Sequence, residues 1–410
     1  MNITRWFKIY YNKITGSIAF IPAILAVSFL LLSLGMLEID FSQWGKQLKS
    51  ELSWLSLKDA STARSIISTV AGALITLTVF SFSLVMIVLN QAASQMSNRV
   101  LTTMIENRVQ QIILGIYTGT IVYALFLLST IRDINSGIYI PALSIYLLII
   151  LTVIDIFLFI YFLDYVTQTV KYETVIHRVQ KQTMATMKEM FEDTKEETVS
   201  WSHMPCLEIK SNESDYFQGY NEKKLLKIAS EKNLFIRFLY TQATYIIKGS
   251  VFMEVYCYAK IDDECVNELL SAIDFYRGQP IERNADYGFI QLAEVALKAL
   301  SPGINDPGTA VISIHTLSDI FAYRLYHKLS SIRYNEKGEQ RIYAPSSSFG
   351  DMFQKCIYPI LNYGKNDQYI QIELTFMAKQ LKAVDHKKLY TALFDTLIKD
   401  VEKQRQINIE

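Results

Sequence analysis

Residues Ser65–Asn98 read SIISTVAGALITLTVFSFSLVMIVLNQAASQMSN and contain no Asp, Glu, Lys or Arg. At about 1.5 Å per residue, such a run makes a helix of roughly 50 Å, whereas the hydrocarbon core of a bilayer is about 30 Å thick. One helix can therefore cross a membrane here and continue beyond it. This length and composition predict an integral membrane protein.

The polar residues of this predicted helix recur at a fixed interval. Every seventh position carries one of them, and Gly72 lies near the same stripe: Thr62, Thr69, Thr76, Ser83, Asn90 and Ser97. Residues that repeat strictly every seven positions stay on one face of a helix only when helices coil around each other. Because lipid offers no partner to hydroxyls and amides, we expect the stripe to face protein or water. Two interpretations stay open, close helix packing and the lining of a narrow pore.

Three other apolar runs have the length of membrane spans, at Ile14–Leu37, Val109–Ile131 and Ile138–Leu163. The third of the four spans in chain order contains Gly115 and Gly119 in a G-x-x-x-G pattern, which permits close helix contact. Asp155 lies inside the last span. An acid inside a membrane is a functional candidate by default, but a protonated Asp that bonds a neighbouring helix explains it equally well.

Basic residues are distributed unevenly between the two sets of helix ends. Eight lie near the ends on the N-terminal side of the membrane, and five lie near the opposite ends: Arg5, Lys8, Lys13, Arg99, Arg108, Lys171, Arg178 and Lys181 against Lys46, Lys49, Lys58, Arg64 and Arg132. Since cytoplasmic loops carry the excess of Lys and Arg, we expect both termini in the cytoplasm. On the opposite side, residues 38–61 predict a short amphipathic helix, and Ser61 is the expected N-cap of the long helix.

The whole pattern predicts a four-helix membrane bundle followed by a cytoplasmic α+β region. We expect a transmembrane domain at 1–165, a helical stalk at 166–200, a β-rich subdomain at 201–280 and a helical subdomain at 281–410. Strands are predicted at Cys206–Lys210, Ser214–Tyr220 and Leu234–Tyr240, and two more flank a Gly249-Ser250 turn. At the level of fold, their order resembles the barrel-sandwich fold of lipoyl and biotinyl carrier domains, without a carrier lysine.

The helical region contains one distinctive corner, Ser301-Pro-Gly-Ile-Asn-Asp-Pro-Gly-Thr309. Ser301-Pro302-Gly303 ends one predicted helix, and Asp306 is well placed to cap the next, with a proline at its first position. A tight corner between helices needs no ligand. The alternative is that Asn305, Asp306 and Thr309 form a ligand or subunit-contact site with the backbone amides at that helix start.

Composition and motifs argue against several classes of function. The 40 basic and 40 acidic side chains balance, and no basic stripe suggests nucleic-acid binding. Four cysteines without C-x-x-C spacing indicate neither a metal site nor a disulfide framework. No hydrolase, metalloprotease, P-loop or dinucleotide motif is present, so we predict no catalytic residue, metal or cofactor.

Two segments resemble a known family across almost the whole chain. Leu89–Leu101 and Phe289–Ala310, which contains LSPGINDPGTA, are similar to the two signature regions of the bacterial family catalogued as domain of unknown function 2254. The resemblance implies a bacterial inner-membrane protein with four N-terminal membrane helices and a soluble C-terminal part. It supplies no reaction, substrate or site.

Two functions of different kinds are compatible with these features. In the first, the lipid-embedded protein is a homo-oligomeric ion channel or transport-related pore, lined by the stripe of the second span, with a cytoplasmic vestibule. Four spans bury too few polar residues for a pore within one subunit, so this function requires oligomers. In the second, the protein is a membrane-anchored sensor or scaffold, and its cytoplasmic region binds a partner or a small-molecule or ionic ligand.

Overall fold

The structure is a computed structural model that describes residues 19–51, 59–95, 108–131, 140–169, 171–193, 204–259 and 261–407. The chain divides into two compact units, Met1–Lys171 and Tyr172–Glu410. Part of the predicted hydroxyl stripe, Ser97, lies outside the described residues, as does the first part of the predicted first span.

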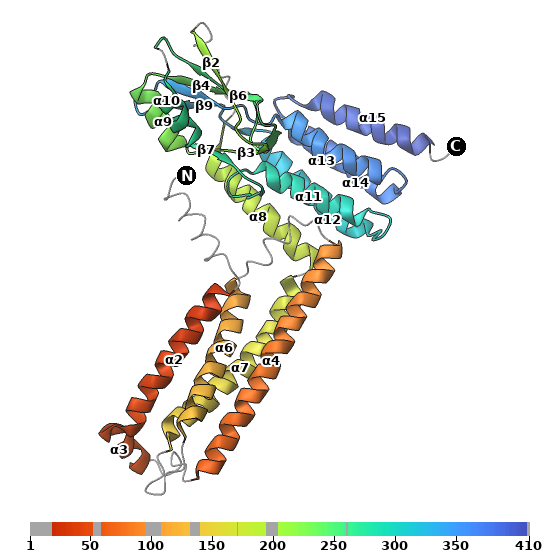
Figure 1. The fold of residues 1–410 in the computed structure, drawn as a ribbon. Coiled ribbons are helices and arrows are strands. Elements are labelled where there is room, and N and C mark those ends of the chain that lie inside the picture. Colours follow the sequence, from red (N-terminus) through yellow and green to blue (C-terminus); the bar gives the residue numbers. More distant parts are fainter. Residues whose placement is uncertain are drawn as a thin grey trace. The chain divides into compact units, whose positions relative to one another are not determined.

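Helices α2 (Phe20–Phe41), α4 (Ala60–Gln95), α6 (Arg108–Thr130) and α7 (Ala142–Thr169) run alongside one another in the first unit (Figure 1). Each is long and apolar enough to cross a membrane, which confirms the four predicted apolar helices. Helix α4 has 36 residues and is by far the longest. The short helix α3 (Gln43–Glu51) lies within the segment predicted to be amphipathic.

The G-x-x-x-G pattern of α6 faces α2, where small residues permit close contact. A Cβ atom added to Gly115 would come within 3.1 Å of the Pro22 Cα, and one added to Gly119 would lie 2.7 Å from the Phe29 ring. Larger side chains at these two positions would therefore separate the two helices. This glycine pair explains why α2 and α6 form the closest helix pair of the unit.

The N-cap of α4 differs from the sequence prediction, which placed it at Ser61. The carboxylate of Asp59 accepts hydrogen bonds from the backbone amides of Ser61 and Thr62 at 3.2 and 3.0 Å, and from both their hydroxyls. These bonds hold the pKa of Asp59 well below its usual range. Asp is as good a cap as Ser, and here it begins the helix two residues earlier.

The second unit is a mixed α/β region followed by helices, as predicted in outline. Its strands are β1 (Phe191–Asp193), β2 (Cys206–Lys210), β3 (Asp215–Tyr220), β4 (Phe235–Phe238), β5 (Thr244–Ile246), β6 (Val251–Tyr256), β7 (Ile273–Phe275), β8 (His327–Leu329), β9 (Ile332–Tyr334) and β10 (Gln340–Tyr343). Its helices are α8 (Tyr172–Met190), α9 (Glu222–Glu231), α10 (Asp263–Leu270), α11 (Asp286–Ala299), α12 (Pro307–Arg324), α13 (Phe349–Tyr363), α14 (Gln368–Val384) and α15 (Thr391–Ile407).

The described strands form a five-stranded sheet in the order β2-β6-β4-β10-β9, a three-stranded sheet β5-β3-β7 and the pair β1-β8. The two strands around Gly249 therefore belong to different sheets. Strands β9 and β10 lie within the segment 281–410, which was predicted to be helical, and β10 pairs in parallel with β4. The likeness to a barrel-sandwich fold stays a prediction.

The helical part packs around α11 and α12, which are joined by the predicted corner. Helix α8, in the segment predicted to be a stalk, packs against both of them. Its Thr183 side chain lies against Gly288 of α11 so closely that a Cβ atom there would overlap it. Phe289 of α11, Phe321 of α12 and Phe353 of α13 are fully buried. The Phe321 ring contacts both of the others, so one apolar core joins the three helices.

Candidate functional site

Among the described residues of the first unit, two aspartates are fully buried, and the carboxylate of the first, Asp40, has several hydrogen-bond donors. Its carboxylate accepts from the backbone amides of Leu143 and Ser144 at 3.1 and 2.8 Å, and from the Ser144 hydroxyl. Lys49 donates from 3.1 Å and balances the charge. Asp40 therefore joins the end of α2 to the start of α7, and its role is structural.

Asp155 has the opposite environment. It lies 13 residues from the start and 14 from the end of α7, so it is at the middle of a candidate membrane span. Its side chain is fully buried, and neither carboxylate oxygen has a hydrogen-bond partner among the described residues. An ionised carboxylate in such surroundings costs several kcal/mol (roughly 3 on insertion scales) unless a proton or a cation compensates its charge.

Three hydroxyl side chains accompany Asp155 at the same level of the unit. Tyr117 and Ser81 are fully buried, and their hydroxyls likewise have no partner among the described residues. Thr120 is also buried, with its hydroxyl beside the Asp155 carboxylate, and Asp155 interacts electrostatically with Tyr117. The Thr120 hydroxyl lies 3.0 Å from the carbonyl of Ile116, and when it donates to that carbonyl its oxygen can accept a hydrogen bond from a protonated Asp155.

We name Ser81, Tyr117, Thr120 and Asp155 the polar layer; along their helices Thr120 and Asp155 fall between two apolar clusters, and Tyr117 belongs to the second of these. One cluster consists of buried residues within 60–71 of α4, in 123–131 at the end of α6 and in 140–148 at the start of α7. The other centres on position 85 of α4, 113–117 of α6 and 162–166 of α7. Phe80 and Phe159, with ring centroids 5.9 Å apart, join α4 to α7 beside the layer. Apolar residues therefore lie on both sides of Thr120 and Asp155 along α6 and α7.

The predicted hydroxyl stripe does not meet Asp155. Thr69, Gly72, Thr76, Ser83 and Asn90 are all exposed on the outer face of α4. The hydroxyls of Thr76 and Ser83 donate to the carbonyls of Gly72 and Val79, at 3.0 and 2.9 Å within their own helix. These two side chains therefore need neither water nor another helix, and the premise that lipid would leave them unpaired is wrong for both.

The corner at Asn305 has the geometry of a helix cap. Asp306 accepts from the Thr309 amide at 3.1 Å and from the Thr309 hydroxyl at 2.6 Å, which confirms it as the N-cap of α12. Asn305 has a positive φ of 50° and makes the turn. These bonds occupy both carboxylate oxygens of Asp306, and a ligand role for this corner stays a prediction.

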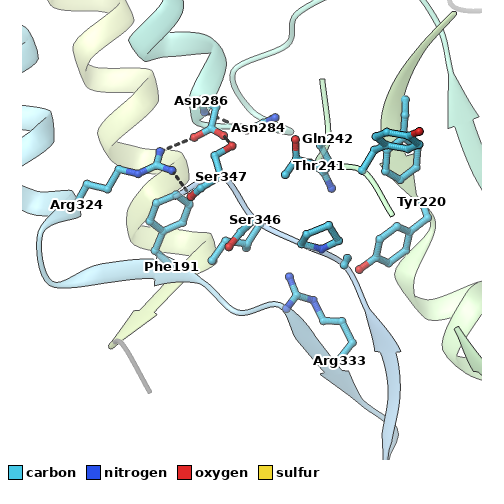
Figure 2. A pocket seen from close by; sticks show the side chains of 15 residues that line it. Phe191, Tyr220, Thr241, Gln242, Asn284, Asp286, Arg324, Arg333, Ser346 and Ser347 are labelled. Atoms are coloured by element: carbon cyan, nitrogen blue, oxygen red, sulfur yellow. Dashed lines mark hydrogen bonds and ion pairs between the residues drawn. The ribbon is translucent and has the colours of Figure 1, made fainter. Parts of the chain in front are cut away.

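The second unit contains a cleft that sequence reasoning missed (Figure 2). Its wall includes a buried ion pair between Arg324 of α12 and Asp286 of α11. Ser347 closes this network: its hydroxyl donates to Asp286, and its carbonyl accepts from Arg324 at 2.9 Å. The remaining wall comes from β1, β3, the segments after β4 and β10, and β9. No local motif could reveal a cleft assembled from segments so far apart in the chain.

These features define a class, a membrane protein with four candidate spans and a separate α/β unit. The chain belongs to the family described as "Predicted membrane protein (DUF2254)", whose model matches residues 15–380. The resemblance seen in the sequence is thereby confirmed. Among the residues that the structure describes, no group of three or more His, Cys, Asp or Glu side chains could hold a metal ion.

The curated relatives that match are themselves uncharacterized proteins. The chain is 24% identical over 339 residues to one from Mycobacterium bovis and to one from Mycobacterium tuberculosis. The match covers 78% of this chain and 63% of each relative, so the chain spans less than two thirds of their length. No solved structure matches the chain.

Proposed function

We propose that this protein is a transport-related protein of the bacterial inner membrane that takes up a proton or a small monovalent cation at Asp155. The observation that carries the proposal is the carboxylate of Asp155, which is fully buried in the middle of a span without a partner among the described residues. We assign no enzymatic reaction to the protein.

The chemistry of the polar layer favours these ions. Its groups are one carboxylate and three hydroxyls, and oxygen atoms are the ligands that hard cations such as Na⁺ prefer. A proton is equally suited, because a protonated Asp155 can donate to the Thr120 oxygen while the Thr120 hydroxyl donates to the carbonyl of Ile116. Intramembrane acids in such surroundings are typical of ion pathways and proton relays.

A structural role explains Asp155 less well. Asp40, in the same unit, shows what a structural aspartate looks like, since its carboxylate accepts four hydrogen bonds from three residues. An aspartate that only joined two helices would have at least one partner of this kind, because an unsatisfied buried polar group destabilises the fold. This contrast between two buried aspartates of the same unit supports an ion-binding role for Asp155.

We also propose that the protein is a homo-oligomer with both termini in the cytoplasm. The excess of Lys and Arg supports this orientation. The outer face of α4, with Thr69, Thr76 and Asn90 exposed, would meet the same face of a second copy. In this arrangement the stripe forms the contact between subunits or lines a pore, and Asp155 binds the ion within each subunit.

The test is ion flux through liposomes that contain the full-length protein. Asp155→Asn removes the charge at nearly constant volume, and Asp164→Asn is a matched control at an exposed position of the same helix. We expect proton, Na⁺ or K⁺ flux from the wild type, a loss of at least tenfold in Asp155→Asn and no change in Asp164→Asn. Melting temperatures should be equal or higher for Asp155→Asn, because no bond is lost.

Two results would contradict the proposal. Wild-type liposomes that pass none of these three ions would exclude the transport function. Undiminished flux through Asp155→Asn would exclude this residue as the binding group. A membrane-anchored sensor or scaffold is the second candidate function, and the cleft of the second unit is the observation that favours it.

A further inference from the structure

The cleft of the second unit encloses only a small space. Its cavity measures about 30 Å³, and one water molecule needs roughly 10–15 Å³ by the same kind of measure. The cavity can therefore hold a few water molecules or one small polyatomic ion. Phe191, Phe217 and Tyr240 contribute aromatic surface to its wall, which limits solvent around any bound group.

The acidic groups beside the cleft are already occupied. Asp286 receives the Arg324 guanidinium and the Ser347 hydroxyl. Arg324 also lies over the Phe289 ring at 5.2 Å, so it is fixed on two sides. Glu222, half exposed, accepts from Arg333 at 3.0 Å. A cation in the cleft would find these carboxylates engaged.

Hydrogen-bond donors are left over. Arg333 uses its Nε on Glu222 and one terminal nitrogen on backbone carbonyls, and its other terminal nitrogen has no partner among the described residues. The Tyr220 hydroxyl and the side-chain amide of Gln242 also line the cleft without a hydrogen-bond partner in the described part of the chain. Asn284 uses only its oxygen, on the amide of Asp286, which leaves its NH₂ group available.

The backbone at Gly219 brings one of these donors into place. A Cβ atom at residue 219 would lie 2.8 Å from the Gln242 Nε2, and Gly219 has a φ of 118°, a conformation that side chains other than glycine rarely adopt. Tyr220 follows directly, with its ring stacked on Phe238 at 4.8 Å. Burial raises the pKa of Tyr220 to about 12, although Arg333 opposes the shift, so its phenol keeps its proton at neutral pH.

We infer that this cleft binds a small oxyanion, of the size of phosphate, sulfate or a short carboxylate. Arg333 and Tyr220 donate to it, and Gln242 and Asn284 complete its coordination. All four residues line the same cleft, and charge-assisted bonds are strongest where water is limited. This site is independent of Asp155 and of ion flux, so either proposal can fail alone.

The experiment is calorimetric titration of the full-length protein in detergent with inorganic phosphate, sulfate and acetate. Tyr220→Phe is the main variant, because it removes one donor and keeps the stacked ring. Arg333→Gln is the second, and Arg277→Gln, whose side chain is 83% exposed, is the control. We expect saturable binding of at least one anion, an affinity reduced about tenfold or more in Tyr220→Phe and Arg333→Gln, and no change in Arg277→Gln.

Absence of saturable binding by the wild type for all three anions would overturn the inference. Unchanged affinity in both Tyr220→Phe and Arg333→Gln would also overturn it, since binding would then lie elsewhere. Wild-type affinity of the Asp155→Asn variant would show that the anion site is separate from the ion site of the first unit.

Discussion

Asp40 shows how much one residue can contribute when all its bonds are made. In Asp40→Asn the Lys49 ammonium loses its counter-charge, and the amide NH₂ group faces donors that need an acceptor. Removing one partner from such a buried network costs about 2–4 kcal/mol. We expect a loss of this size in the free energy of unfolding, measured by denaturant unfolding in detergent.

Ser28→Ala is the matched control for this change in α2. The Ser28 hydroxyl is exposed and donates only to the carbonyl of Ile24 in its own helix. Its removal should alter the free energy of unfolding by less than about 0.5 kcal/mol. Equal stabilities of Asp40→Asn and wild type would show that the bonds between α2 and α7 do not hold the first unit together.

The two buried aspartates also show what a sequence can reveal about single residues. Asp155 stood out because an acid in the middle of an apolar run is expensive wherever the chain folds. Asp40 did not, because its partners Leu143 and Ser144 lie more than 100 residues away. Whether the Tyr117 and Ser81 hydroxyls find hydrogen-bond partners depends on the side chains of the neighbouring helices. A local sequence pattern does not contain that information.

At the scale of the helix, Gly115 gives a direct test of packing. Gly115→Val places side-chain atoms where Leu25 and the Pro22 backbone now lie, so α2 must move away from α6. Overpacking of this kind costs about 1–3 kcal/mol. We expect a corresponding loss of thermal stability in detergent, together with increased access of protease to α2.

Gly72→Val is the control, because a Cβ atom at that exposed position of α4 meets nothing within 4 Å. It should leave the stability of the first unit unchanged or slightly raise it, since Gly is a poor helix former. The same variant also tests the proposed oligomer. A lower native mass of the assembly with an unchanged melting temperature would place Gly72 at a subunit contact. Equal destabilisation by both glycine variants would contradict the packing between α2 and α6.

Helices and strands with a strong periodic pattern could be predicted from the sequence. The pairing of the strands into sheets could not. The alternation in Cys206–Lys210 and the long apolar runs were sufficient to predict strands and spans at these positions. The sequence gives no sign that β5 and β6 part into different sheets, because both flank an ordinary glycine turn. Strands β9 and β10 are only three and four residues long, too short for a clear period.

At the scale of the whole molecule, each unit has an apolar core of its own. The second contains one cluster among its sheets and another around α11, α12 and α13. We therefore expect residues 172–410, expressed without the membrane spans, to fold cooperatively. Circular dichroism and thermal unfolding would check this, and an insoluble fragment or one without a transition would contradict it.

The pairing of β4 with β10 has a consequence for synthesis. Strand β4 emerges from the ribosome about 100 residues before β10, the strand that covers its second edge. Until translation passes residue 343, that edge remains open and can recruit strands from other nascent chains. Assembly of this sheet must then wait for a distant segment, which makes it slow. Chaperone dependence during overproduction should therefore originate in the second unit, at a moment when the membrane helices have already left the ribosome.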